Sequence, residues 1–148
     1  MQFRFRPATE HVERPTWTWI AVALEVFTGV AAIPVGLMLI TDPTGAGIGL
    51  PPAWIEGTVF GNYAIPGIYL LVVNGIGMLL VAALTVLRHW IAPWLTGALG
   101  AGLVIWILVQ LAIMPETMVL QWIFLAIGIV MGFTALFWLR RTGQLVLR

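Results

Sequence analysis

Four long apolar stretches dominate this chain of 148 residues, and each is long enough to cross a lipid bilayer as a helix. They cover residues 17–40, 63–87, 91–114 and 117–139, and the last three contain no charged residue. A helix rises about 1.5 Å per residue, so about 20 apolar residues span a hydrocarbon core of about 30 Å. We therefore predict an all-α integral membrane four-helix bundle, with one four-span domain over residues 17–148 and a tail over residues 1–16.

The composition excludes several classes of function. Charged residues make up 9% of the chain, against about 25% in soluble domains, and the net charge of +1 offers no basic surface for nucleic acid. The chain contains no cysteine, which excludes disulfides and thiolate metal sites. It also contains no recognisable catalytic triad, phosphate-binding loop or zinc-ligand cluster. These observations predict no catalytic residue and no metal site, and they favour a non-enzymatic role.

The distribution of charge predicts how the chain crosses the membrane. All seven basic residues lie in the tail, in the second connection or at the C-terminus: Arg4, Arg6, Arg14, Arg88, Arg140, Arg141 and Arg148. The only charged residues of the first and third connections are acidic, namely Asp42, Glu56 and Glu116. Because positively charged loops stay in the cytoplasm, we predict cytoplasmic termini and an inner or plasma membrane location. An aromatic belt at the inner interface would then contain Trp17, Trp19, Trp90, Trp94 and Trp138.

The connection between the first two spans is the longest and contains most of the turn signals. Its start, Asp42-Pro43-Thr44-Gly45, predicts a β-turn, and residues 51–57 predict one helical turn begun by proline and ended by glycine. Many of its residues are apolar, so we expect an ordered cap over the outer end of the bundle. This cap either lines the mouth of a ligand site or seals the bundle. Its candidate site residues are Asp42, Trp54, Glu56 and Tyr63.

Each span also contains one strongly polar side chain: Glu25, Asn74, Gln110 or Gln121. Glu25 shares a helix face with small residues, namely Ala21, Gly29, Ala32 and Gly36. Small residues let helices approach closely, so we expect Glu25 to face a neighbouring helix and to be protonated or hydrogen-bonded there. The fourth span has a comparable face, where Gly128 and Gly132 form a GxxxG motif.

The depths of these polar groups allow two interpretations. Glu25, Asn74 and Gln110 lie about 12, about 20 and about 28 Å from the inner interface, which arranges them as a staircase. Such spacing suits a path for protons or small polar solutes. The alternative is that they form interhelical hydrogen bonds, each worth about 0.6 kcal/mol. Interhelical hydrogen bonding is enough to explain the amides, such as those of Asn74 and Gln110. For the carboxyl group of Glu25, both interpretations remain open.

Four short motifs lie in the long connection and in the second and third spans. They are Asp-Pro-x-Gly at residues 42–45, Gly-Leu-Pro at 49–51, Gly-x-x-Phe-x-x-Tyr-x-x-Pro-Gly at 57–67, and Trp-Ile-x-x-Gln at 106–110. Together they resemble a widespread group of small, uncharacterised bacterial four-helix membrane proteins, which is loosely similar to the DoxX-like proteins. The resemblance implies the architecture but no established activity, although some DoxX-like proteins are linked to quinone-coupled oxidoreductases.

We therefore expect a small multi-pass membrane protein without enzymatic chemistry. It would act as a scaffold or accessory subunit of a larger membrane complex or homo-oligomer, or it would bind a lipophilic ligand beneath the cap over residues 42–63. A quinone or a lipid would be the bound molecule in the second case. The alternative is a proton-coupled carrier or a quinone-linked redox subunit that uses Glu25.

Overall fold

The computed structural model describes residues 2–3 and 13–146, and in that part of the chain four helices are long and apolar enough to cross a membrane. The first span is α1 (Trp19–Thr41), preceded by the 3-10 helix η1 (Thr16–Thr18). The second span joins α2 (Ala64–Tyr69), the π-helix η4 (Leu70–Gly77) and α3 (Met78–Val86). The third and fourth are α4 (Ala92–Ile113) and α5 (Val119–Arg141). The predicted all-helical, four-span class is confirmed.

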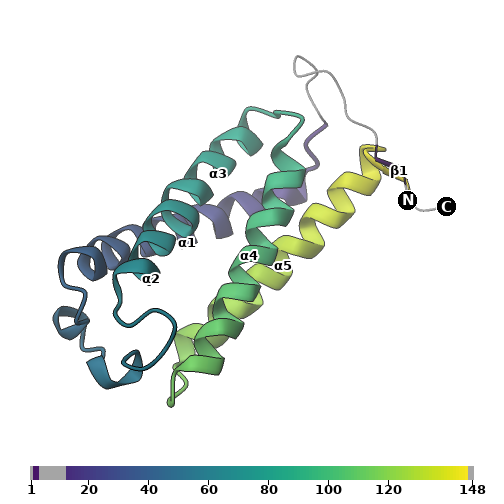
Figure 1. Ribbon diagram of the computed structural model, residues 1–148. Helices are drawn as coiled ribbons and strands as arrows, with labels where there is room; N and C mark the ends of the chain where they lie inside the picture. The colour runs from purple at the N-terminus through teal and green to yellow at the C-terminus, as the bar shows by residue number, and fades with distance from the viewer. Residues whose placement is uncertain (1, 4–12, 147–148) are drawn as a thin grey trace.

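The ends of the described chain lie at one end of the bundle, which we call the termini end. There β1 (Gln2–Phe3) pairs antiparallel with β2 (Leu145–Val146). Arg4, Arg6 and Arg148 of the predicted basic termini lie outside the described residues. The long connection lies at the opposite end, which we call the loop end (Figure 1).

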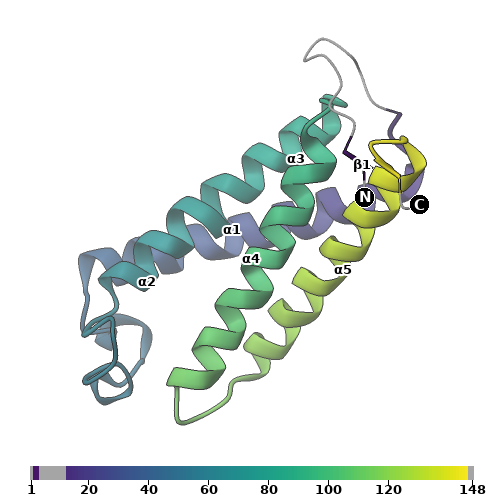
Figure 2. The same ribbon diagram turned by 45° about the vertical axis from the view of Figure 1, so that its right-hand side comes forward.

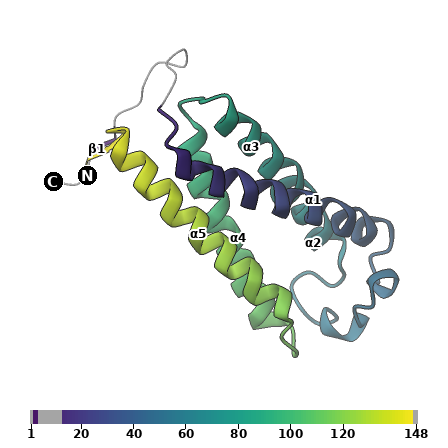
Figure 3. The same cartoon turned by 180° about the vertical axis from the view of Figure 1, so that it is seen from behind.

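The helices form two arms that meet near the termini end and diverge toward the loop end. One arm consists of α1 packed along the second span, and the other of α4 packed along α5 (Figure 2). The same divergence is visible from behind, where α1 and α5 separate toward the loop (Figure 3). Direct contact between α1 and α5 is sparse, and it includes the stacked rings of Phe27 and Phe124, whose centroids are 6.1 Å apart.

Glycines set the separation of α1 from the second span. A Cβ atom at Gly36 would lie 2.7 Å from the backbone nitrogen of Leu71 and 2.9 Å from the carbonyl oxygen of Gly67. The predicted face of small residues around Glu25 is confirmed, because every member of it is buried. The first arm is therefore held together by backbone-to-backbone proximity, as expected for small residues in membrane helices.

Glycines also allow the close approach of α4 and α5 in the second arm. A Cβ atom at Gly128 would lie 2.9 Å from the carbonyl oxygen of Gly100 on α4, and one at Gly100 would lie 2.9 Å from the carbonyl oxygen of Gly128. At Gly132, the other glycine of the GxxxG motif, an added Cβ would meet nothing within 4 Å among the described residues. Only Gly128 of this motif is thus needed for the close approach of α4 and α5.

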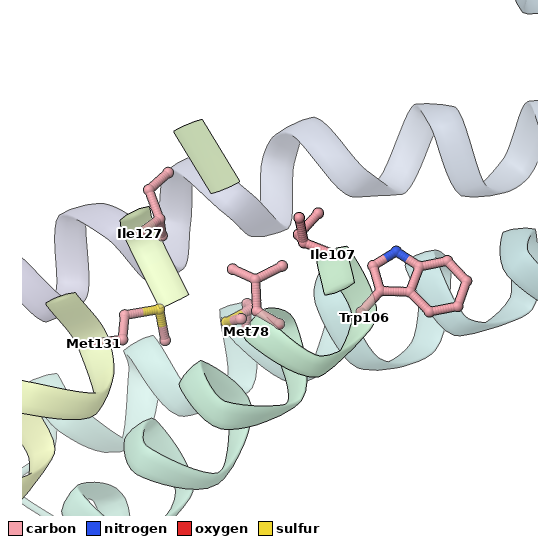
Figure 4. Packing of buried hydrophobic residues seen from close by; sticks show 6 residues of the cluster. Met78, Trp106, Ile107, Ile127 and Met131 are labelled. Carbon is pink, nitrogen blue, oxygen red and sulfur yellow. The ribbon is translucent and has the colours of Figure 1, made fainter. Parts of the chain in front are cut away.

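The main apolar core lies where the two arms meet. Side chains from α3, α4 and α5 converge there (Figure 4), namely those of Met78, Leu103, Trp106, Ile107, Ile127 and Met131. Large side chains on the outer faces of the spans, such as Val30, Leu80 and Ile105, are exposed and apolar. This distribution is the one expected where the solvent is lipid.

One tryptophan of the predicted inner belt is buried against the protein. Trp138 is fully buried and packs with Ala92 and Trp17, and its indole nitrogen donates a hydrogen bond of 2.8 Å to the carbonyl oxygen of Glu13. Trp138 therefore packs within the protein at the termini end, and its position at the membrane interface stays a prediction. The segment before α1 folds back over the end of α5 and covers this side chain.

Candidate functional site

The carboxylate of Asp42 organises the start of the long connection. The predicted β-turn is confirmed, because the amide of Gly45 donates to the carbonyl oxygen of Asp42 at 3.1 Å. The carboxylate accepts from the Thr44 hydroxyl at 2.6 Å and from the Gly47 amide at 2.9 Å. These hydrogen bonds lower the pKa of Asp42 from its ordinary value of 3.8, and the bond from the Thr44 hydroxyl has the largest effect. Asp42 thus shapes the loop.

The loop should lose the hydrogen bonds to the Asp42 carboxylate only in acid. The pKa of Asp42 is lower in the folded state than in the unfolded state. Its contribution to the stability of the loop is therefore fully present above pH 3.8, and it is lost as the pH falls through the lower folded-state pKa. We expect the hydrogen-exchange protection of the Gly47 amide to fall over that range. In Asp42→Ala, which has no acceptor, that protection should be low at every pH. Equal protection in Asp42→Ala and the parent chain at neutral pH would contradict this role.

Tyr63 fastens the end of the loop to its start. Its ring is buried, its hydroxyl donates to the carbonyl oxygen of Pro51 at 3.0 Å, and its amide donates to that of Pro43 at 2.9 Å. Gly45 has a φ of +77°, and a Cβ there would lie 2.8 Å from the Tyr63 ring. Only glycine fits such a position without strain. The loop is therefore an ordered cap.

Two other loop candidates are less buried than Tyr63. The predicted helical turn is the 3-10 helix η3 (Pro52–Trp54), in which Trp54 is half-buried, and Glu56 just beyond it is exposed. A second 3-10 helix, η2 (Ala46–Ile48), lies nearer α1. Trp54, Glu56 and Asp42 do not line the cavity described next, whereas Tyr63 does.

An apolar cavity of about 460 Å³ lies between the diverging arms, beneath the cap. Helix α1, the cap, the second span, α4 and α5 all contribute to its wall. Three of the four polar residues predicted within the spans line it, namely Asn74, Gln110 and Gln121. Glu25 does not. The structure thus brings the three amides to one cavity and separates them from the carboxyl group.

Asn74 lies in the middle of the π-helix η4. π-Helical turns are rare and occur frequently at functional sites. The Asn74 side chain is 1% exposed, and neither its oxygen nor its nitrogen has a hydrogen-bond partner among the described residues. A buried amide without partners is costly, so a polar group that bonds to it would be bound favourably.

Two further unpartnered polar groups line the same cavity. The hydroxyl of Thr28 on α1 and the indole nitrogen of Trp106 on α4 are buried, and neither has a partner in the described part of the chain. Trp106 is held in place by stacking on Tyr69, with ring centroids 4.4 Å apart, and by an edge contact with Phe60 of the cap at 6.4 Å. The Tyr69 hydroxyl donates to the carbonyl oxygen of Gly102 at 3.1 Å, which ties α2 to α4.

The other lining amides lie toward the loop end. Gln121 is satisfied locally, because its oxygen accepts from the Met118 amide at 2.9 Å and its nitrogen donates to the Met114 sulfur at 3.4 Å. It therefore caps the start of α5. Gln110 is half-buried near the end of α4. Among the amides predicted from the sequence, Asn74 alone is fully buried and unpaired in the described residues.

Glu25 forms a separate polar contact. It is completely buried, and its Oε1 atom accepts a 2.6 Å hydrogen bond from the hydroxyl of Thr96 on α4. Its Oε2 atom has no partner among the described residues. The contact joins the two arms near their meeting point, as a hydrogen bond between α1 and α4.

Sequence reasoning did not single out Thr28 or Thr96. Threonine in a membrane helix commonly bonds to its own backbone, so its presence carries little information. The one available signal was that Thr28 follows Glu25 by three residues and so shares its helix face.

Neither a protein-family model, nor a curated protein, nor a solved structure matches this chain. Within the described residues no group of three or more histidine, aspartate or glutamate side chains could hold a metal ion. The functional argument therefore rests on the cavity and its polar groups.

Proposed function

We propose that this multi-pass membrane protein binds a lipophilic ligand in the cavity beneath the residue 42–63 cap. The observation that carries the proposal is the apolar cavity of about 460 Å³ whose lining includes Asn74, a residue with an unpaired buried amide among the described residues. Ligand sites in proteins typically have volumes of about 300–1,000 Å³, apolar walls and a few polar groups that orient the ligand. The cavity combines all three properties.

The position of the cavity supports entry from the lipid. Two lining residues on opposite helices, Val35 of α1 and Leu120 of α5, are 36% and 62% exposed. Both belong to the apolar spans, so the side of the cavity between α1 and α5 faces the bilayer. The cap closes the loop end through Tyr63 and Phe60. An apolar molecule would therefore reach the cavity without crossing water.

The proposal is tested by native mass spectrometry of the full chain released from lipid nanodiscs without detergent. We expect one lipophilic molecule retained per chain after annular phospholipids have been stripped by collisional activation. Retention should disappear when the sample is first equilibrated with an excess of empty nanodiscs. A chain that never retains more than nonspecific phospholipid would overturn the proposal.

We also propose that the termini end faces the cytoplasm in the inner or plasma membrane. At the termini end, Arg14 precedes η1, Arg88 follows α3, and Arg140 and Arg141 end α5. At the loop end, Asp42 follows α1, Glu56 follows η3, and Glu116 lies between α4 and α5. This asymmetry supports the orientation through the positive-inside rule. Green fluorescent protein fused after Arg148 should fluoresce, because it folds in the cytoplasm. If that fusion is dark and an alkaline phosphatase fusion at the same position is active, the termini end faces the other side of the membrane.

A second candidate function is proton-coupled transport through Glu25. It is favoured by the complete burial of this carboxyl group and by its unpaired Oε2 atom among the described residues. The variant Glu25→Gln separates the two functions, because its amide oxygen can still accept from Thr96 but carries no titratable proton. A ligand-binding protein should keep both its fold and its ligand in Glu25→Gln. Proton flux that is measurable in liposomes and lost in this variant would establish the second candidate instead.

The control for that experiment is Glu25→Leu. It leaves the buried Thr96 hydroxyl without an acceptor, which costs about 1–3 kcal/mol of stability. We therefore expect Glu25→Leu, but not Glu25→Gln, to lower the midpoint of unfolding in mixed micelles.

A further inference from the structure

We infer that the ligand is a neutral lipophile with a single hydroxyl or carbonyl head, and that this head lies against Asn74 on the second span. The inference rests on the proposed function and specifies the chemistry of the same site. It is carried by two observations: the absence of charge from the cavity wall, and the grouping of the unpaired polar atoms on that wall.

The first observation concerns charge. Within the described part of the chain, no residue that lines the cavity carries a charge. An ionised head would leave water for an apolar wall without a counter-ion, at a cost of several kcal/mol. No described arginine lines the cavity, so an anionic head would find no cation there. Carboxylate and phosphate lipids are thus disfavoured.

Among the described residues, the cavity wall also offers no anionic partner for a cationic head. Of the acidic loop residues, Asp42 already receives hydrogen bonds from Thr44 and Gly47, and Glu56 is exposed. Neither lines the cavity. Glu25 is bonded to Thr96 and does not line the cavity either. A charged amine would therefore lose its hydration without gaining an ion pair.

The second observation concerns hydrogen bonding. Asn74 offers both a donor and an acceptor, Thr28 offers a hydroxyl, and Trp106 offers a donor. All three are unpaired in the described residues and line the one cavity. A hydroxyl head can bond to both ends of the amide, and a carbonyl head can accept from the amide and the indole. Either satisfies groups that otherwise cost about 1–3 kcal/mol each when buried.

The rest of the wall fits an alkyl or isoprenoid chain. Toward the loop end the lining consists mainly of aliphatic side chains of α1, the cap and α4, such as Leu39, Ile48 and Ile113. The chain of the ligand would lie among them, or leave through the side opening between Val35 and Leu120. The head is therefore placed deep in the protein and the tail toward the cap and the lipid.

The test uses the full chain in phosphatidylcholine nanodiscs and a diazirine-bearing alkane that has no head. Light-induced labelling of cavity residues is followed by peptide mass spectrometry. Unlabelled dodecanol, dodecanoate, dodecylammonium and dodecane then compete at equal mole fractions in the bilayer. We expect dodecanol to compete about tenfold more strongly than the other three, which corresponds to about one hydrogen bond to a buried group.

The matched variants are Asn74→Leu and Gln110→Leu, which each replace one lining amide by an apolar side chain. Asn74→Leu should still be labelled by the alkane but should no longer prefer dodecanol over dodecane. Gln110→Leu should keep the preference. Because Asn74 has no partner to lose, its replacement should not destabilise the fold. Thr28→Val removes another unpaired polar group of the cavity wall, and we expect a weaker preference for dodecanol in this variant.

The outcomes separate the two proposals. Absence of cavity labelling in the parent chain would overturn the proposed function itself. Labelling with equal competition by dodecanoate, dodecylammonium or dodecane would overturn only the neutral-head inference. Loss of the preference in Gln110→Leu, with retention in Asn74→Leu, would place the head at the loop end and overturn the assignment to Asn74.

Discussion

Replacing Ala31 by tryptophan is expected to weaken ligand binding about tenfold or more, because the new ring would occupy the space that the ligand needs. Ala31 lies on α1, is half-buried and lines the cavity. Ala31 is not part of the face of small residues around Glu25 that packs on the second span. A larger side chain at Ala31 can therefore extend into the cavity. The expected readout is loss of alkane-diazirine labelling and of the ligand retained in native mass spectrometry.

The neighbouring position supplies the control. Val30 is 60% exposed, does not line the cavity and faces the lipid. Val30→Trp adds an aromatic ring to the same turn of the same helix but leaves the cavity open. Its labelling should match that of the parent chain. Equal losses in the two variants would show that labelling reports the outer surface of α1, and the cavity would no longer be the binding site.

Replacing Gly128 by alanine is expected to lower the free energy of unfolding by about 1–3 kcal/mol. The added methyl group would lie 2.9 Å from the carbonyl oxygen of Gly100 and from Val104 Cγ2, and 3.2 Å from the Val104 amide nitrogen. Two of these three atoms belong to the backbone, so relief requires α4 and α5 to separate. Because this pair forms one complete arm, the loss should be measurable by unfolding in mixed micelles.

Gly132→Ala is the matched control for that substitution. It adds the same methyl group one turn later on α5, where the new Cβ would meet no described atom within 4 Å apart from its chain neighbours and the adjacent backbone of its own helix. Alanine also favours helix over glycine by up to about 1 kcal/mol. Gly132→Ala should therefore be neutral or slightly stabilising. If it destabilises as much as Gly128→Ala, the loss reflects a partner outside the chain and not the α4–α5 contact.

Local physical chemistry made much of the fold predictable from the sequence. The length and hydropathy of each apolar stretch depend only on neighbouring residues, and they predicted four helices that could cross a membrane. The Asp42 turn was predictable because its hydrogen bonds close within a few residues. The small face around Glu25 was predictable because helical periodicity alone decides which residues share a face.

The candidate site depended on tertiary structure. The sequence arranged Glu25, Asn74 and Gln110 by depth, yet the fold joins Asn74 and Gln110 in one cavity and bonds Glu25 to Thr96. The packing of the two arms against each other decides this, through contacts between distant residues such as Glu25 with Thr96 and Tyr69 with Gly102. Such contacts join residues that are far apart in the chain, so no local pattern encodes them. The sequence by itself determined where the polar groups lie along each helix, whereas only the packing between helices decided which of them remain unpaired around a cavity.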